Sequence, residues 1–288
     1  MFLRRHLWLL GALLAFGGQA HGQFGSPNAL TAEEKAQGWK LLFDGAAATG
    51  LRGLQKPDFL KAGWSIVRGE LYLAKDFKDM GKVTGGDLVS TEQFEDFEFS
   101  FEWKLSVAAN TGVRYLARRG AGGVATGMEY QIIDDVHHPE GLKGGPIRRT
   151  GALDGILPPI DNKRLQDAGE WNRGRIVLQG AHVEHWLNGQ KVVEFDLGSR
   201  ALTAAAQAAK AKVQPGFGTK FKSPVVLLDQ GDEVSFRALK IRALPRLPAV
   251  PVTSPVPATP ASVIPKGAPT TPAARPAVAS PPTAPNLR

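Results

Sequence analysis

The stretch DFEFSFEWKLS, residues 96–106, alternates apolar and polar side chains without a break. The apolar members are Phe97, Phe99, Phe101, Trp103 and Leu105, and the polar members between them are Glu98, Ser100, Glu102 and Lys104. A period of two residues is that of a β-strand, whose successive side chains point to opposite faces. The stretch therefore predicts a strand with one face on a hydrophobic core and the other toward solvent or a ligand.

Strand signals of the same kind continue on both sides of this stretch. Residues 64–73 hold two short apolar runs with a turn at Arg68-Gly69, and residues 175–195 hold three runs broken at Gln179-Gly180 and Asn188-Gly189. Asn-Gly suits a two-residue type I′ turn, because both residues tolerate a positive φ angle. A last strand is expected in 234–244. Short strands joined by glycine-rich turns favour an all-β sandwich or jelly roll.

One or two short helices are expected beside these strands. Thr31, followed by Glu34 three residues later, forms a capping box, which marks the start of a helix. Residues 201–213, ALTAAAQAAKAKV, are the other helical stretch and are expected to form a surface insertion between late strands.

The two ends of the chain differ in composition from the middle. Residues 1–22 carry two arginines, an apolar run from Leu7 to Phe16 and then small residues, which is the layout of a secretory signal peptide. The run is shorter than the roughly 20 residues that span a bilayer. Residues 245–288 are rich in proline and alanine and lack an apolar period, which predicts a disordered tail. The domain is therefore expected in 23–244, in a secreted or periplasmic protein.

The distribution of charge indicates which partners to expect, and the cysteine content bears on the compartment. Of the surplus of eight positive charges, two lie in residues 1–22 and four in 245–288, which leaves a surplus of two for the domain. A nucleic-acid-binding domain would carry a concentrated basic face, so no nucleic acid is expected as a partner. The basic residues of the tail leave a contact with anionic envelope polymers open. The chain has no cysteine and so needs no disulfide in an oxidising compartment.

Residues 127–139, GMEYQIIDDVHHP, end in a cluster of carboxylates and imidazoles. In a strand, Glu129 and Gln131 would share the face opposite the apolar side chains. Four groups follow at the end of that strand: Asp134, Asp135, His137 and His138. They could hold a divalent metal or act as a general acid and base, and a solvated turn would have the same composition. No metal-ligand spacing of a known motif is matched, so these alternatives stay open.

Aromatic residues give a second set of candidates. Trp186 shares a predicted face with His182 and Glu184, which suits a ligand surface, whereas His185 alternates with apolar residues and is expected to point inward. Trp171 begins a strand, where it would serve either packing or a sugar ring.

The order of short motifs along the chain resembles that of the secreted bacterial 3-keto-disaccharide hydrolase family, whose fold is of the concanavalin A-like lectin/glucanase type. The matching pieces are GWKLLFDG (38–45), GGDLVSTEQFEDFEFSFEWKLS (85–106), the turn NTGV (110–113), MEYQIIDD with the histidines after it, TGAL (150–153), GEWNRGRIVLQGAHVEHWLNGQKVVEFD (169–196), PGFG (215–218) and LLDQGDEVSFRALKIR (227–242). The resemblance implies a concanavalin A-like β-sandwich over essentially the whole domain.

The resemblance also implies an activity, the cleavage of 3-keto-glycosides or disaccharides. A ketone at C3 of a sugar acidifies the C2 hydrogen, so a base at C2 can start the elimination or hydrolysis of the glycosidic bond. Among the residues of this chain, the catalytic candidates are Glu129, Asp134, His138 and Asp229. The substrate-binding candidates are Gln131, Asp135, Trp171, Trp186 and Gln230. No transferable cofactor is needed, although a divalent metal could stabilise the C3 oxygen. A non-catalytic carbohydrate-binding protein of the envelope is the alternative, because this fold supports both functions.

The chain departs from the family pattern at a few positions. Leu228 and Gln230 stand where the family usually has glutamine and histidine, and Ala238 stands for asparagine. After TGAL, Asp154 and Gly155 replace the usual tyrosine and aspartate. These departures imply a slower reaction, a different substrate, or binding without catalysis.

Overall fold

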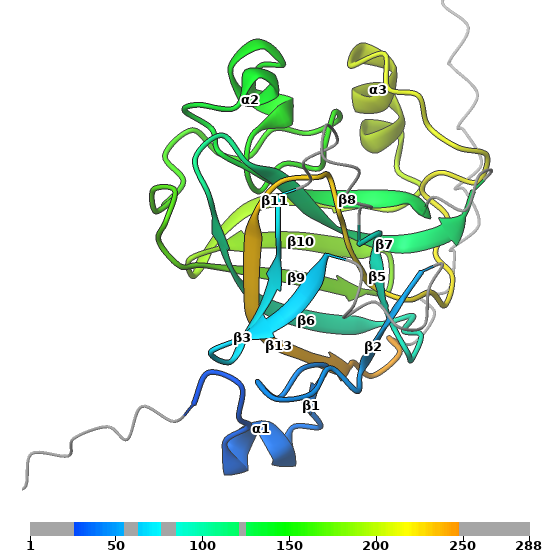
Figure 1. The fold of residues 1–288 in the computed structure, drawn as a ribbon. Coiled ribbons are helices and arrows are strands. Elements are labelled where there is room, and N and C mark those ends of the chain that lie inside the picture. Colours follow the sequence, from blue (N-terminus) through cyan, green and yellow to red (C-terminus); the bar gives the residue numbers. More distant parts are fainter. Residues whose placement is uncertain (1–25, 55–62, 76–84, 121–124, 248–288) are drawn as a thin grey trace, which may run out of the picture. The chain divides into compact units, whose positions relative to one another are not determined.

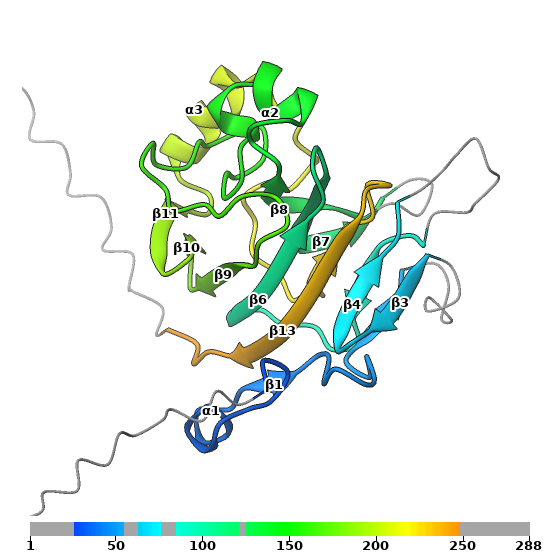
Figure 2. The ribbon, with the colours of Figure 1, turned by 60° about the vertical axis from the view of Figure 1, so that its left-hand side comes forward.

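Two antiparallel sheets carry the fold of the computed structural model, which describes residues 26–54, 63–75, 85–120 and 125–247 (Figures 1 and 2). The larger sheet has the strand order β11 (Gln190–Asp196), β10 (His182–Leu187), β9 (Asn172–Gln179), β6 (Phe97–Leu105), β13 (Val234–Ala243), β4 (Glu70–Leu73) and β3 (Trp64–Val67), with β1 (Lys40–Leu41) paired to β13. The smaller sheet has the order β2 (Leu51–Gly53), β5 (Leu88–Ser90), β12 (Val226–Leu227), β7 (Asn110–Arg119) and β8 (Ala125–Ile133).

The hydrophobic core lies between the sheets and contains the apolar face of β6. All five of its apolar side chains are buried, and Phe101 packs edge-on against Tyr130 of β8 with the ring centroids 5.4 Å apart. Tyr130 and Ile132 are fully buried as well, so both sheets contribute to one core. The predicted all-β, concanavalin A-like sandwich is therefore confirmed.

The turns and caps follow the local sequence. Asn188 and Gly189 both have positive φ angles in the β10–β11 hairpin, and Arg68-Gly69 does the same between β3 and β4. Helix α1 (Ala32–Ala36) has the predicted capping box between Thr31 and Glu34.

Three local expectations differ from the structure. Residues 110–113 do not form a turn but begin strand β7, because Asn110 and Gly112 pair with Ile133 and Gln131 of β8. Helix α3 (Arg200–Ala208) ends before residue 213, and the chain continues as an irregular loop. Helix α2 (Pro139–Lys143) and the short 3-10 helix Pro146–Arg148 were not expected, since their glycines and prolines are typical of turns.

The polar face of β6 is also less open than expected. Glu98 and Glu102 are both buried, and each carboxylate lies between two arginines of the neighbouring strands. Glu102, for example, accepts hydrogen bonds from Arg173 of β9 and Arg237 of β13. The outer face of the larger sheet is thus a network of mutually neutralised charges.

The chain divides into two units, Met1–Leu247 and Pro248–Arg288. The predicted signal peptide, residues 1–22, lies outside the described residues, and so does the predicted tail beyond residue 247. Among the residues that the structure describes, no helix is long and apolar enough to cross a membrane.

Candidate active site

A cavity of about 680 Å³ lies on the side of β7 and β8 that faces away from the core. Two loops complete its walls: residues 147–156, which follow α2, and residues 209–219, which follow α3. Helices α2 and α3 lie at the same end of the domain, opposite α1, in both views (Figures 1 and 2). Segments that are a hundred residues apart in the sequence therefore meet at this cavity.

Glu129 reaches the cavity because its neighbours on β8 point into the core. Residues 151–154 pair with the outer edge of this strand: Gly151 N–H donates to the Gln131 carbonyl (2.8 Å) and Asp154 N–H donates to the Glu129 carbonyl (3.0 Å). Glu129 consequently keeps only 7% of its surface exposed, and Asp154 is held beside it in the same cavity.

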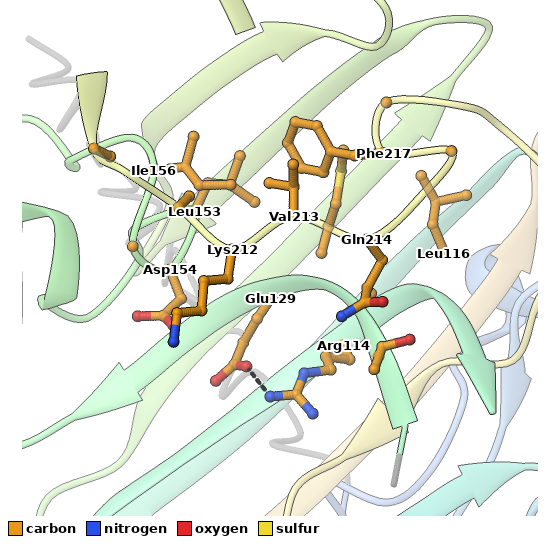
Figure 3. A pocket seen from close by; sticks show the side chains of 18 of the residues that line it. Arg114, Leu116, Glu129, Leu153, Asp154, Ile156, Lys212, Val213, Gln214 and Phe217 are labelled. Atoms are coloured by element: carbon orange, nitrogen blue, oxygen red, sulfur yellow. Dashed lines mark hydrogen bonds and ion pairs between the residues drawn. The ribbon is translucent and has the colours of Figure 1, made fainter. Parts of the chain in front are cut away.

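Each oxygen of the Glu129 carboxyl group has a neighbour. Arg114 lies opposite Glu129 in the β7–β8 ladder, and its Nη2 donates to Oε2 at 2.7 Å (Figure 3). The Nε2 of Gln230 approaches Oε1 at 3.5 Å, and Asn110 Nδ2 fixes the orientation of that amide by donating to Gln230 Oε1 at 2.9 Å. The carboxyl group lies over Gly112, where a Cβ atom would stand only 2.5 Å from Oε1.

The electrostatics of this cavity favour proton transfer near neutral pH. Burial raises the pKa of Glu129 to about 7; Arg114 opposes this, and the charge of Asp154 adds to it. Burial also raises the pKa of Asp154, against the effect of Arg148, whose Nη1 lies 2.7 Å from Oδ2. The other oxygen, Oδ1, is buried without a hydrogen-bond partner among the described residues. A carboxyl group with a pKa near 7 in a cavity is a candidate general base.

The carboxylates after β8 make structural bonds instead of lining this cavity. The Asp134 carboxylate accepts hydrogen bonds from the N–H groups of Ala108, Val136 and His137, and it contacts the His137 ring at 2.8 Å. These bonds hold the loop between β8 and α2 in place.

Asp135 and His138 also make bonds within the protein and do not line the cavity. Asp135 accepts from Thr150 N–H and forms an ion pair with the buried Lys163. His138 is the N-cap of α2, and its Nδ1 accepts from Glu140 N–H at 3.1 Å.

Two further candidates from the sequence also lie outside the lining of the cavity. Asp229 accepts hydrogen bonds from the N–H groups of Gly86 (2.7 Å) and Gly231 (2.9 Å), so it braces the turn between β12 and β13. Gln131 is buried, and its side-chain oxygen accepts from Ile132 N–H. Of the four catalytic candidates, the structure places only Glu129 in the cavity, with Gln230 beside it.

The residues that the structure describes include one group close enough to share a metal ion: His182, Glu184 and Glu194 on β10 and β11. The ammonium of Lys191 contacts both of these carboxylates, so a side-chain cation already lies beside them. The residues at 134–138, for which a metal was one of the alternatives left open, form no comparable group within the described residues.

A second cavity of about 710 Å³ lies between α1 and the outer face of the larger sheet, and Trp186 lines it. The guanidinium of Arg175 covers the Trp186 ring at 4.0 Å, and that of Arg237 covers Trp171 at 3.9 Å. Burial works to raise the pKa of Glu102 in this cavity, but its two arginine partners lower it below the ordinary value. A carboxylate held ionised by two cations is a poor base, so the Glu129 cavity is the candidate active site.

Several residues of the Glu129 cavity were not singled out in the sequence. Arg114 had no motif to mark it, and Asp154 stood out only as a departure from the family pattern. The signal that could have led to the site is Gly112, because a glycine inside a strand often marks the close approach of another group.

Comparisons with known proteins agree with this architecture. Residues 38–242 match the family model described as the 3-keto-alpha-glucoside-1,2-lyase-like domain. A protein of Bacteroides thetaiotaomicron named 3-keto-disaccharide hydrolase is 28% identical over 231 residues, which cover 73% of this chain and 79% of that protein.

Two solved structures from Parabacteroides distasonis ATCC 8503, both described as candidate glycosyl hydrolases, are also similar. One is 30% identical with a TM-score of 0.66 and covers 76% of this chain and 99% of its own. The other is 27% identical with a TM-score of 0.55 and covers 72% and 99%. The prediction of a hydrolase related to the 3-keto-disaccharide hydrolases is confirmed by these matches. Because the family model matches residues 38–242, most of the chain, this protein belongs to the 3-keto-alpha-glucoside-1,2-lyase-like family.

Proposed function

We propose that the Glu129 cavity cleaves the glycosidic bond of 3-keto-glycosides, with Glu129 as the base that removes the C2 proton. The observation that carries this proposal is a buried carboxyl group with a pKa of about 7 in a cavity of ligand size. The family and the name of the Bacteroides relative support the same substrate class.

The reaction follows from the acidity that the ketone confers on its neighbour. Glu129 takes the C2 proton, and the electron pair of that C–H bond is stabilised as an enolate of the C3 ketone. The enolate then expels the oxygen on C1, which forms a C1–C2 double bond and releases the alcohol. Water adds across this double bond, with hydroxyl to C1 and a proton to C2. The net change is hydrolysis, and no oxidant or reductant is consumed.

Positive groups around Glu129 suit the charges that develop in this reaction. Arg114 lies beside the base, and Arg148 lies beside Asp154 on the 147–156 loop side of the cavity. Hydrogen-bond donors fixed in a buried site stabilise an enolate oxygen far more than water does. We assign Asp154 a positioning role, because its charge helps to keep the pKa of Glu129 near neutrality.

The function is tested with two chromogenic glucosides that share one leaving group and differ only in oxidation at C3. We expect release from the 3-keto compound alone, because the C2 hydrogen of the unoxidised sugar is not acidic. A substrate deuterated at C2 should react more slowly or lose its label to solvent. Binding of both compounds without any release would overturn the proposal and indicate a carbohydrate-binding protein.

The pH dependence is a second expected result. Because the base must be ionised, kcat/KM should rise with pH through an apparent pKa of about 7. Asp154→Asn removes a negative charge that raises the pKa of Glu129, so the rising limb should move to lower pH. A pH–rate profile of both proteins measures this. A rising limb that stays in place or moves to higher pH in the variant would contradict the assignment.

We also propose that the protein is secreted or periplasmic, on the basis of the leader-like residues 1–22. N-terminal sequencing of protein recovered from the periplasm or medium should begin near Gln23. Protein that stays in the cytoplasm with Met1 at its start would refute this location.

A further inference from the structure

The Glu129 cavity has two ends of different chemistry. The charged side chains Arg114, Glu129, Asp154 and Lys212 gather at one end, and Figure 3 shows apolar side chains at the other. The labelled apolar residues are Leu116, Leu153, Ile156, Val213 and Phe217. They come from β7 and from both loops, so three separate segments of the chain build one apolar wall.

Part of this wall is surface that the fold leaves uncovered. Val213 is 43% exposed, and Ile156 and Phe217 are half-buried with one side packed on the core. Single exposed apolar residues are normal in proteins. Here, however, they converge on a cavity and adjoin the candidate base, as apolar walls of ligand sites do.

Leu116 joins the wall to the hydrophobic core, because it is only 5% exposed and packs in the core while also lining the cavity. The register of β7 shifts between Tyr115 and Arg118, and Leu116 has a φ angle of 48° within this irregularity. A positive φ angle is strained for a branched side chain, and strain of this kind is concentrated at functional sites. A bulge also changes the direction of a side chain. The bulge thus brings a core residue to the edge of a cavity that also contains charged side chains.

We propose that the alcohol released in the reaction is an apolar, ring-sized aglycone and not a second sugar. This inference rests on the proposed function. The 3-keto ring would lie on the charged end, over Glu129 and Arg114, and the aglycone would lie against Val213 and Phe217. A second sugar would direct several hydroxyl groups at this apolar wall, and hydroxyl groups buried without hydrogen bonds are costly.

Among the residues of the charged end, Lys212 is next to the apolar wall, because Val213 follows it in the 209–219 loop. Its side chain extends from the 209–219 loop toward the charged end, on the same side as Asp154 (Figure 3). When the C1–O bond breaks, the electron pair stays on the oxygen of the aglycone, which then takes a proton from the ammonium or from solvent. A cation at this boundary stabilises that developing charge.

The inference is tested with two 3-keto-glucosides, one with cyclohexanol and one with glucose as the leaving group. Both leaving groups are alcohols, so the comparison reports on fit to the wall and not on the acidity of a phenol. We expect kcat/KM to be at least about tenfold higher for the cyclohexyl compound, which corresponds to the burial of a few CH₂ groups. A ratio of one or less would overturn the inference and leave the proposed function intact.

Variants of the wall should change the same ratio. Val213→Asn places an amide at an exposed position, so the fold is not at risk, and it should lower the preference for cyclohexyl roughly three- to tenfold. Phe217→Ser is a second variant with the same expected direction. Val136→Asn is the matched control, because Val136 is a 62% exposed valine outside the cavity.

A binding experiment tests the inference about the wall without relying on turnover. Calorimetry with unoxidised cyclohexyl glucoside and with cellobiose needs no turnover, and the cyclohexyl compound should bind more tightly. If neither oxidised substrate is cleaved, the proposed function fails, and this comparison still decides the chemistry of the wall. Equal or tighter binding of cellobiose would overturn the inference.

Discussion

Glu129→Gln is expected to lower kcat for 3-keto-glycoside cleavage by about three orders of magnitude, the middle of the range for losing a general base. The amide has the size of the carboxylate but cannot take a proton from C2, so binding should change far less than kcat. Glu92→Gln is the control, since Glu92 is an exposed glutamate outside the cavity that pairs with Lys40. Turnover of Glu129→Gln within tenfold of the parent protein would exclude Glu129 as the base.

The same variant should be more stable than the parent protein at alkaline pH. The pKa of Glu129 is about 7 in the folded protein against an ordinary value of 4.5, so the folded state binds more protons between these values. The parent protein therefore loses stability as pH rises from 4.5 to 7, and glutamine does not. Above pH 7 the free energy of unfolding of the variant should exceed that of the parent protein by roughly 3 kcal/mol, because each tenfold change in proton affinity is worth about 1.4 kcal/mol. Urea unfolding at pH 5 and pH 8 measures it, and a variant that is less stable at pH 8 would contradict the sign.

This expected gain in stability separates a functional carboxyl group from a structural one. Glu98 and Glu102 are also buried, but each lies between two arginines that offset the cost of burial. Glu129 has Arg114 on one oxygen, and the nearby charge of Asp154 opposes its ionisation. A group kept in an environment that disfavours its charge indicates selection for reactivity over stability.

The strands were predictable because their signals are local. The alternation in 96–106 requires only that one face be buried, and the Asn188-Gly189 turn requires only two residues that tolerate positive φ angles. The capping box of α1 is contained within four residues. Such features depend on neighbours in the sequence, so the sequence pattern is sufficient to find them.

The cluster at 134–138 shows that composition alone does not say which bonds the residues of a loop make. Carboxylates in a loop are common at active sites, yet the donors nearest to a short side chain are the N–H groups of its own loop. Asp134 and His138 both make such bonds, the former with Val136 and His137 and the latter with Glu140. The residue types alone could not distinguish these two uses.

The cavity was harder to predict because it depends on long-range pairing. Arg114 meets Glu129 through the β7–β8 ladder, and Asp154 meets it because residues 151–154 pair with the outer edge of β8. No periodicity in the sequence specifies that pairing segment. Two of the departures from the family pattern, Asp154 and Gln230, nevertheless flank Glu129 from opposite parts of the chain. These two differences from the family pattern thus lie beside the candidate base.

Gly112→Ala is expected to lower kcat by about two orders of magnitude, the typical cost of displacing a reacting group by roughly 1 Å. A Cβ atom at this position would stand 2.5 Å from Oε1 of Glu129, a distance that real Cβ atoms essentially never show, and 3.0 Å from its Cδ, which is also a tight contact. The backbone of β7 accepts alanine here, because Gly112 has no positive φ angle. The carboxyl group, at the end of a flexible side chain, must therefore move away from its place beside Arg114.

A double-mutant cycle tests whether this loss acts through Glu129. Glu129→Asp alone should be slow, because the shorter side chain withdraws the base from C2. Adding Gly112→Ala to it should cost much less than the same change in the parent protein, since aspartate leaves space for the new methyl group. Thermal unfolding of all four proteins checks that they are folded. Equal losses in both backgrounds would show that Gly112 acts on the strand and not on the base, and full activity of Gly112→Ala would place the reaction elsewhere.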